Sequence, residues 1–211
     1  MKHKPVLIKN QHDIELLKVI KYIGVVNMEF RDDLHHPLPP YHIYELADQE
    51  IAISAVSAYR TFDQHIEFLR DALKNGIRIY VLILHPNSPE VDSLSKREDK
   101  PILDDIKGVI GVIKRENFYN NSNFKIKFLI KLPPYTAVMI DGDIETIGKP
   151  MDRYGLMRIQ LRGVHSTQHE GLIIQLKKKN NKQRGAFEYY AKDLRDQWKI
   201  DGTEHPELFS S

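Results

Sequence analysis

The sequence predicts an α/β fold with a mixed, largely parallel central sheet flanked by helices, and three consecutive stretches carry this prediction. Residues 51–58 form an apolar run without alternation, which is typical of a strand covered on both faces. Residues 61–76 have helical periodicity and end at Asn-Gly, and residues 77–84 form a second apolar run. Such a strand–helix–strand unit implies two parallel strands joined by a right-handed crossover.

Further elements are predicted on both sides of this unit. Apolar residues recur at helical spacing over residues 12–23, 41–49, 104–116 and 187–200. Strands are expected over residues 25–31, 124–131 and 171–177. Thr61 and Gln64 have the spacing of a capping box, so a helix is expected to begin at Thr61. We expect one domain over residues 1–200 and a C-terminal tail over residues 201–211.

Composition restricts the classes of function. The 31 Lys and Arg residues are nearly balanced by 29 Asp and Glu, so net charge does not by itself indicate a nucleic-acid-binding protein. The chain has no cysteine, which excludes disulfides, thiolate metal sites and cysteine nucleophiles. No apolar run approaches the roughly 18 residues of a membrane span, and the N-terminal residues lack the apolar core of a signal peptide. We therefore expect a cytoplasmic protein with no membrane partner.

Residues 132–148 form the most informative stretch of the chain. They read as two short strands around an Asp141-Gly142 turn. Asp-Gly is a preferred two-residue hairpin turn, because both positions adopt positive φ. This interpretation by itself accounts for Asp141.

The same stretch resembles the catalytic strand of the phospholipase D superfamily, whose motif is His-x-Lys-x4-Asp. With Asp141 as the Asp of that motif, Pro134 stands at the His position and Thr136 at the Lys position. Other pieces are similar to prokaryotic phospholipase D-like domains without an intact motif: Phe30-Arg31, Ser54-Ala-Val-Ser57, Leu82-Ile-Leu-His-Pro-Asn-Ser88 and Tyr189-Tyr-Ala-Lys-Asp-Leu-Arg-Asp-Gln-Trp198. The similarity covers roughly residues 21–200 and implies a phospholipase D-like half-unit.

The resemblance implies a scaffold without its chemistry. Active members use one histidine as a nucleophile towards phosphorus and a second as acid and base, while lysines hold the phosphate oxygens. Proline cannot supply an imidazole and threonine cannot supply a cation. We therefore expect a non-catalytic module that binds a small anionic ligand or a protein partner in a sensor or regulatory role. The alternatives are a phosphodiesterase or nuclease with a non-standard active site, and a nucleic-acid-binding accessory protein.

A homodimer is the second implication of the resemblance. Active members need two motifs, so a single half-unit must pair with another. A half-unit alone would leave open the apolar face that meets its twin, which is unfavourable in water. A two-fold dimer is the commonest symmetric assembly.

Ligands of parallel α/β sheets bind beyond the carboxyl ends of the strands. The side chains expected there, together with those beside the vestigial motif, are Arg31, Ser57, Arg60, His85, Asn87, Ser88, Tyr135, Thr136 and His165. Arg60 is the best anion contact, because a guanidinium can hold phosphate or carboxylate through two hydrogen bonds. Structural alternatives are an Arg60–Asp63 surface pair, turn formation at Asn87 and Ser88, and β propensity for Tyr135 and Thr136.

Two further polar clusters remain open. His165 and His169 have the spacing of a chelating pair on a helix and stand beside Glu170, but the neighbouring residues do not read as a helix. No metal or cofactor is therefore predicted, and either histidine could instead replace the missing catalytic one. A basic run contains Lys177, Lys178, Lys179, Lys182 and Arg184. It could contact nucleic-acid phosphates or form a solvated hairpin tip.

Overall fold

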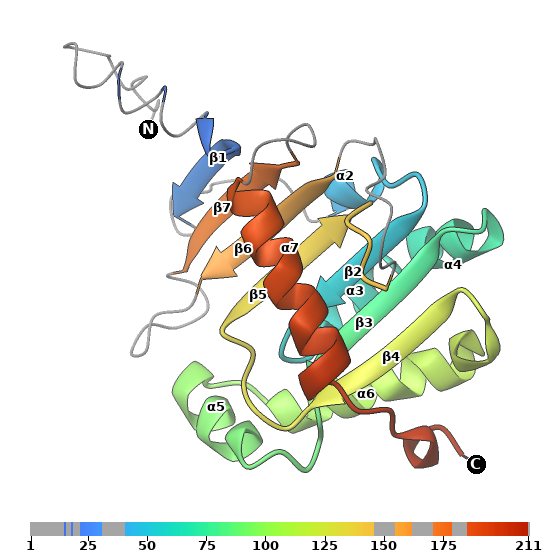
Figure 1. The fold of residues 1–211 in the computed structure, drawn as a ribbon. Coiled ribbons are helices and arrows are strands. Elements are labelled where there is room, and N and C mark those ends of the chain that lie inside the picture. Colours follow the sequence, from blue (N-terminus) through green and yellow to red (C-terminus); the bar gives the residue numbers. More distant parts are fainter. Residues whose placement is uncertain are drawn as a thin grey trace, which may run out of the picture.

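Seven strands form one open sheet with the order β1-β7-β6-β5-β2-β3-β4 (Figure 1). This arrangement comes from a computed structural model that describes residues 15, 18, 22–30, 41–145, 155–161, 171–178 and 185–210. The strands are β1 (Val25–Phe30), β2 (Glu50–Ser54), β3 (Arg78–Leu84), β4 (Phe124–Leu129), β5 (Tyr135–Ile140), β6 (Leu156–Leu161) and β7 (Leu172–Lys177). The α-helices are α2 (Tyr41–Tyr44), α3 (Tyr59–Gln64), α4 (Ile66–Lys74), α5 (Glu90–Glu98), α6 (Ile102–Arg115) and α7 (Ala186–Asp196).

The sheet has a parallel half and an antiparallel half. Strands β2, β3 and β4 run parallel, and the crossover between β2 and β3 is the strand–helix–strand unit that the sequence predicts. The other four pairings, β2–β5, β5–β6, β6–β7 and β7–β1, are antiparallel. The α/β class and the mixed sheet are thus confirmed, but the expectation of a largely parallel sheet is wrong. It extrapolated one βαβ unit to strands that are joined without helical crossovers.

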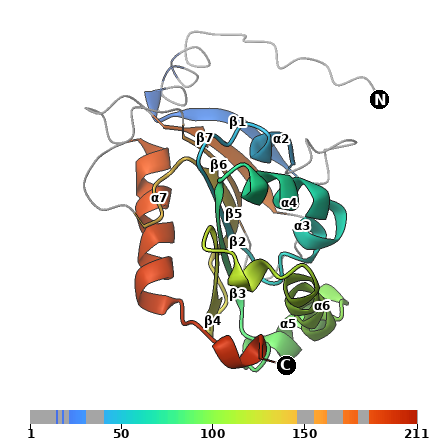
Figure 2. The same ribbon diagram turned by 90° about the vertical axis from the view of Figure 1, so that its right-hand side faces the viewer.

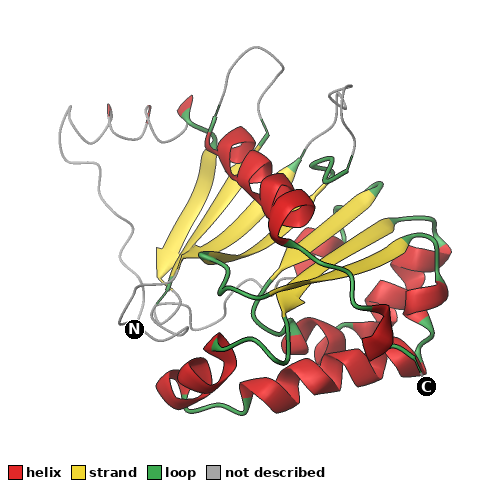
Figure 3. Ribbon diagram, turned by 60° about the horizontal axis from the view of Figure 1, so that its bottom comes forward, coloured by secondary structure: helices red, strands yellow, loops and turns green. Residues whose placement is uncertain are grey.

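Helices cover the two faces of the sheet unequally. Figure 2 shows the sheet edge-on, with α7 on one face and α3, α4 and α6 on the other. The apolar side of α6 is buried as its spacing predicts, through Ile106, Val109, Ile110 and Ile113. Figure 3 gives a second view of α7, in which the helix crosses over the strands of the sheet. The parallel half is therefore enclosed by helices on both faces.

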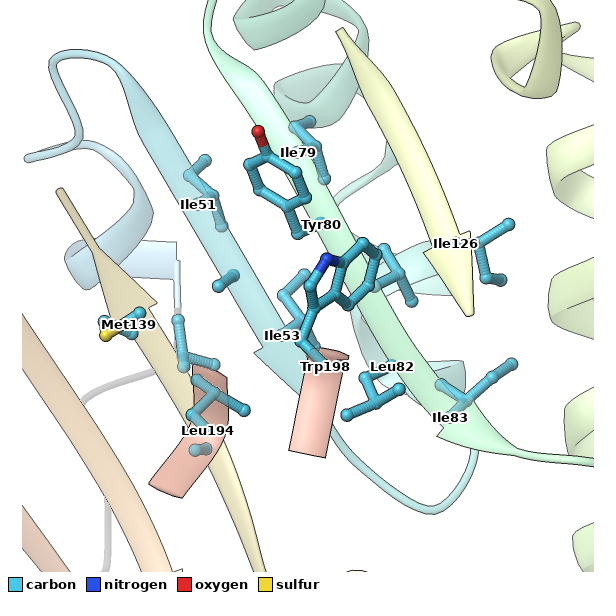
Figure 4. Packing of buried hydrophobic residues seen from close by; sticks show 14 of the residues in the cluster. Ile51, Ile53, Ile79, Tyr80, Leu82, Ile83, Ile126, Met139, Leu194 and Trp198 are labelled. Carbon is cyan, nitrogen blue, oxygen red and sulfur yellow. The ribbon is translucent and has the colours of Figure 1, made fainter. Parts of the chain in front are cut away.

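The core under α7 is built around Trp198, the tryptophan of the π-helical turn (Gln197–Asp201) that continues α7. Its ring meets Tyr80 of β3 edge-to-face, with the ring centroids 5.3 Å apart. Figure 4 shows Trp198 over Tyr80 and Leu82, and Leu194 near Met139 of β5. Burial of a large apolar side chain contributes on the order of 1.5–3 kcal/mol, so this contact is a main attachment of α7 to the sheet.

The partner of β5 differs from the prediction. In place of a two-residue turn at Asp141-Gly142, β5 pairs with β6, beginning at Ile140 opposite Leu156. Positive φ occurs at Asp141 (50°) and Asp143 (59°), as the chain leaves β5. The tight-hairpin interpretation is therefore wrong, and the strand β6 was not predicted.

One other local expectation is corrected. Thr61 lies inside α3 and its hydroxyl is 3.1 Å from the hydroxyl of Tyr44, so it caps no helix. Thr203, in the predicted C-terminal tail, forms an antiparallel bridge with Phe128 of β4. The helix expected over residues 12–23 lies mostly outside the described residues.

Candidate functional site

The described ligand-binding candidates follow β2 and β3 or begin β5, so the topology brings them to one end of these strands. Strands β2 and β3 end there, and β5 begins there because it runs antiparallel to β2, with Ser54 opposite Ala137. Several candidates lie outside the described residues: Arg31, His165, His169, Glu170, Lys179, Lys182 and Arg184. The remaining candidates have four different surroundings.

Arg60 lies in the first turn of α3, and Ser57 precedes that helix. Ser57 is half-buried, and its hydroxyl accepts a hydrogen bond from the backbone N–H of Tyr59 at 3.4 Å. Arg60 is exposed. Burial raises the pKa of Asp105 in α6, and the positive charges of Lys100 and Arg60 oppose that shift. The charge of Arg60 therefore acts on α6, which differs from the surface pair with Asp63 that the sequence suggested.

His85, Asn87 and Ser88 form the turn between β3 and α5. The Nδ1 atom of His85 accepts the backbone N–H of Asn87 at 3.0 Å. The hydroxyl of Ser88 donates to the carbonyl of Ile130 at 2.5 Å and accepts the backbone N–H of Glu90 at 3.2 Å. His85 and Ser88 are buried, whereas Asn87 is exposed. These bonds assign Ser88 and the His85 ring to holding the turn.

Tyr135 faces α7 rather than solvent. Its hydroxyl donates a short hydrogen bond to a carboxylate oxygen of Asp193. The side-chain amide of Gln197 donates to the same Asp193 oxygen at 2.8 Å and to the Tyr135 hydroxyl at 3.3 Å. Burial, followed by the contact with Asp193, raises the pKa of Tyr135. The buried Tyr135 therefore joins β5 to α7 and is not free to meet a ligand.

Thr136 points to the opposite face, because side chains alternate along a strand. It lies directly opposite Gln160 of β6. At the next position on the same face, Arg158 lies opposite Val138 on one side and opposite Gln175 of β7 on the other. We call Thr136, Arg158, Gln160 and Gln175 the β5–β6 polar face. All four residues are half-buried.

The β5–β6 polar face acts electrostatically on α2. Burial raises the pKa of Tyr44 to about 12, although the hydrogen bond with Thr61 and the positive charge of Arg158 act in the opposite direction. The positive charge of Arg158 therefore reaches the buried Tyr44 hydroxyl. A half-buried guanidinium with amide and hydroxyl neighbours suits recognition of an oxyanion. None of the four residues is a histidine or a lysine, the two residue types that the resemblance calls for.

Sequence reasoning missed Arg158 and Gln160 because it missed β6. The signal was present, since residues 156–161 read Leu-Met-Arg-Ile-Gln-Leu and alternate polar with apolar side chains around Arg158. The predicted Asp141-Gly142 hairpin assigned the residues directly after the turn as the partner strand of β5, so no later strand was sought. The pairing of β5 with β6 is what brings an arginine next to Thr136.

Asp141, which the sequence analysis placed at the Asp position of the motif, lies at the other end of β5 and is 2% exposed. Its carboxylate accepts the backbone N–H groups of Asp48, Gln49 and Glu50 at 2.9–3.0 Å. Each bond ties the end of β5 to the start of β2. Asp141 thus has a purely architectural role in these contacts.

Glu50 is fully buried next to this junction. Its carboxylate accepts the backbone N–H of Ile144 at 2.8 Å and lies 3.5 Å from the guanidinium of Arg78. Burial raises the pKa of Glu50 to about 7, helped by Asp143 and Asp141 and opposed by the Ile144 hydrogen bond and Arg78. Within the described part of the chain, no group of three or more His, Asp or Glu side chains is arranged to hold a metal ion.

Comparisons with known proteins identify a fold but no family. No protein-family model matches the chain, and no curated protein matches it. A solved structure of TrmBL2, an archaeal chromatin protein with a novel mode of DNA binding, is similar with a TM-score of 0.51 and 11% sequence identity. The match covers 92% of this chain and 62% of TrmBL2, so this chain spans less than two thirds of its length. Among the described residues, no helix is long and apolar enough to cross a membrane.

Proposed function

We propose that this protein is a non-catalytic, phospholipase D-like module that binds a small anionic ligand on the β5–β6 polar face, with Arg158 as the principal ligand contact. The observation that carries the proposal is the register of β6 against β5. It sets Gln160 beside Thr136 and Arg158 beside Val138, on the face where the resemblance calls for the missing lysine. An arginine from the neighbouring strand thus supplies a cation that Thr136 cannot.

The chemistry of the face favours binding over hydrolysis. A guanidinium offers a planar fork of N–H donors that matches phosphate or carboxylate, and it keeps its charge at all physiological pH values. Partial burial of Arg158 strengthens its attraction for an anion, because the effective dielectric constant there is lower than in water. With Pro134 and Thr136 at the two motif positions, the start of β5 lacks the imidazole and the ammonium group that the resemblance calls for.

The succession of elements supports the resemblance on which the proposal rests. The expected order was strand, helix, strand, helix, several strands and a closing aromatic helix. The chain follows this order from β2 to α7, and α7 carries buried Phe187 and is continued by the turn that contains Trp198. The similar solved structure has the same α/β class of fold across 92% of this chain.

Calorimetry with phosphate, sulfate and mononucleotides tests the proposal. A charge-assisted contact contributes on the order of 1.5–3 kcal/mol, so Arg158→Gln is expected to weaken binding by roughly ten- to a hundredfold at 1.4 kcal/mol per decade. Arg115→Gln removes a guanidinium on α6 that is 67% exposed and pairs with Glu116, and serves as the matched control. Equal affinity of Arg158→Gln and wild type, with unchanged melting temperature, would refute the site.

Arg60 remains the second candidate for the anion contact. Its exposed position beside Asp105 predicts a weaker role, because a solvated guanidinium gains little from a solvated anion. We expect Arg60→Ala to change affinity less than about threefold. A larger loss for Arg60→Ala than for Arg158→Gln would move the ligand to the α3–α6 side of the sheet edge.

Nucleic-acid binding is the second candidate function, and the likeness to TrmBL2 favours it. The relevant residues are Lys177 and Lys178 at the end of β7, where Lys177 lies opposite Leu156. That end is the opposite sheet edge from Thr136 and Gln160, so the two candidate functions use separable surfaces. Replacing Lys177, Lys178 and Lys179 by alanine should abolish salt-dependent binding to duplex DNA in fluorescence anisotropy, yet leave binding of a small anion unchanged.

The homodimer belongs to the proposal as well. A phospholipase D-like half-unit is expected to pair about a two-fold axis. Light scattering at high micromolar concentration should give twice the chain mass of 24.6 kDa. A mass near 24.6 kDa would count against the dimer and against the half-unit resemblance.

A further inference from the structure

The C-terminal segment, residues 203–210, is held against the outer edge of β4. Thr203 and Phe128 exchange two backbone hydrogen bonds, of 2.8 and 3.0 Å. The Phe209 ring stacks on Tyr119 with centroids 4.4 Å apart, and Lys114 of α6 donates to the carbonyl of Ser210 at 3.2 Å. A small number of contacts therefore holds this short segment on β4 and α6, and the segment can detach while the sheet stays folded.

Two histidine rings form the centre of this attachment. His85, at the end of β3, and His205, in the C-terminal segment, have ring centroids 4.4 Å apart. Phe128 packs edge-on against both rings, with centroids 5.7 Å away in each case. His85 is 7% exposed, so its ring is enclosed by the segment and β4 rather than by water.

The hydrogen bonds define which protonation state fits. Nδ1 of His85 accepts the backbone N–H of Asn87, so the neutral ring carries its proton on Nε2. A protonated ring would carry a proton on both nitrogens and oppose the Asn87 N–H with an N–H of its own. It would also place a positive charge next to the His205 ring. The closed arrangement therefore requires a neutral His85.

We infer that residues 203–210 form a pH-sensitive latch, which is closed on β4 while His85 is neutral and opens when His85 is protonated. The titratable groups that act on His85 are His205 and Glu207, and β4 contributes the Phe128 ring and the Leu129 carbonyl, which accepts the His85 backbone N–H. The Nδ1 atom of His205 lies 2.6 Å from Glu207, which partly offsets charge in the segment.

The direction of the pH dependence follows from the environment of His85. Burial lowers the pKa of His85, the neighbouring His205 lowers it further, and Glu207 opposes them. A base whose pKa is lowered in the closed state stabilises that state above its ordinary pKa of about 6.5. The stabilisation is lost as the pH falls from that value through the lowered pKa. Acidification should therefore open the latch without unfolding the sheet.

Amide hydrogen exchange followed by NMR tests the latch, with the amides of Thr203 and Phe128 as reporters. After correction for intrinsic exchange, we expect their protection to fall by up to about tenfold between pH 7.5 and 5.5, and a tenfold change corresponds to about 1.4 kcal/mol. Amides within β3 should keep their protection, which separates opening from global unfolding. The midpoint should coincide with titration of the His85 ring nitrogens.

Three variants test whether the pH dependence of the reporter amides comes from His85. His85→Phe keeps a ring against Phe128 but cannot be protonated, so the reporter amides should lose their pH dependence. His65→Phe is the matched control: burial also lowers the pKa of His65, but this residue contacts Tyr44, far from the segment in the fold. It should behave as wild type. Should His85→Phe fail to fold, His205→Phe decides, since removing the imidazole that acts on His85 must reduce the pH dependence. Reporter protection that is independent of pH while His85 titrates would overturn the latch.

Discussion

The two ends of β5 differ in what they preserve of the motif that the chain resembles. At its end, buried Asp141 receives three backbone N–H groups from residues that precede it by more than 90 positions. At its start, exposed Pro134 and half-buried Thr136 provide neither imidazole nor ammonium. The comparison separates two roles within one motif. Asp141 links the end of β5 to the start of β2, whereas the residues at the His and Lys positions differ from those of the motif.

Removal of the Asp141 carboxylate should have the largest effect. Asp141→Ala leaves three backbone N–H groups at the start of β2 without their acceptor and forces alanine into positive φ. We expect a loss of about 3–5 kcal/mol in the free energy of unfolding, measured with urea. Asp141→Asn tolerates the same φ and keeps an acceptor oxygen, so it should lose less. A loss below about 1 kcal/mol for Asp141→Ala would contradict the architectural role.

Glu50 at the same junction should make stability depend on pH. Its pKa rises from 4.5 to about 7 in the folded state. The folded state therefore binds the proton more tightly, and its stabilisation is complete below pH 4.5 and is lost as the pH rises through about 7.

The matched variant for this pH dependence is Glu50→Gln, which keeps an acceptor for the Ile144 N–H but does not titrate. Denaturation at pH 5 and pH 8 should show it more stable than wild type at pH 8, by on the order of 1–3 kcal/mol, and similar at pH 5. A wild-type stability that is flat between these pH values would show that Glu50 is ionised throughout.

An intermediate effect is expected at the start of β5, where Tyr135 joins the strand to α7. Tyr135→Phe removes the donor to Asp193 in a buried network and should cost about 1–2 kcal/mol in thermal or urea unfolding. Tyr189→Phe is the control, since Tyr189 is 71% exposed on the same helix and should change stability by less than about 0.5 kcal/mol. Equal losses in the two variants would mean that the Tyr135 hydroxyl is unimportant.

The smallest effects should come from the vestigial motif positions themselves. Thr136→Ala is expected to change the free energy of unfolding by less than about 0.5 kcal/mol, because Thr136 is half-buried and lies at the beginning of the strand.

The unmodified protein should not turn over bis-p-nitrophenyl phosphate, single-stranded DNA or phosphatidylcholine. Turnover that His165→Ala or His169→Ala abolishes would instead establish a non-standard active site.

Local periodicity determined much of the fold. The apolar runs at 51–58 and 77–84, with the amphipathic stretch between them, predicted the parallel β2–β3 pair that the structure contains. The apolar face of α6 was predicted by the spacing of Ile106, Val109, Ile110 and Ile113. Such elements follow from sequence because a buried strand or an amphipathic helix carries its signal within a dozen residues.

Tertiary structure alone decided the partner of β5 and, with it, the candidate site. The Asp141-Gly142 pair is a strong local turn signal, but the Asp141 carboxylate accepts backbone N–H groups of Asp48, Gln49 and Glu50, and the strand that pairs with β5 begins only at Leu156. Thr61 likewise bonds to Tyr44, not to its own helix. Side-chain hydrogen bonds to residues distant in sequence outweigh local propensity in a buried setting. For that reason Arg158 reaches the neighbourhood of Thr136 only in the folded chain.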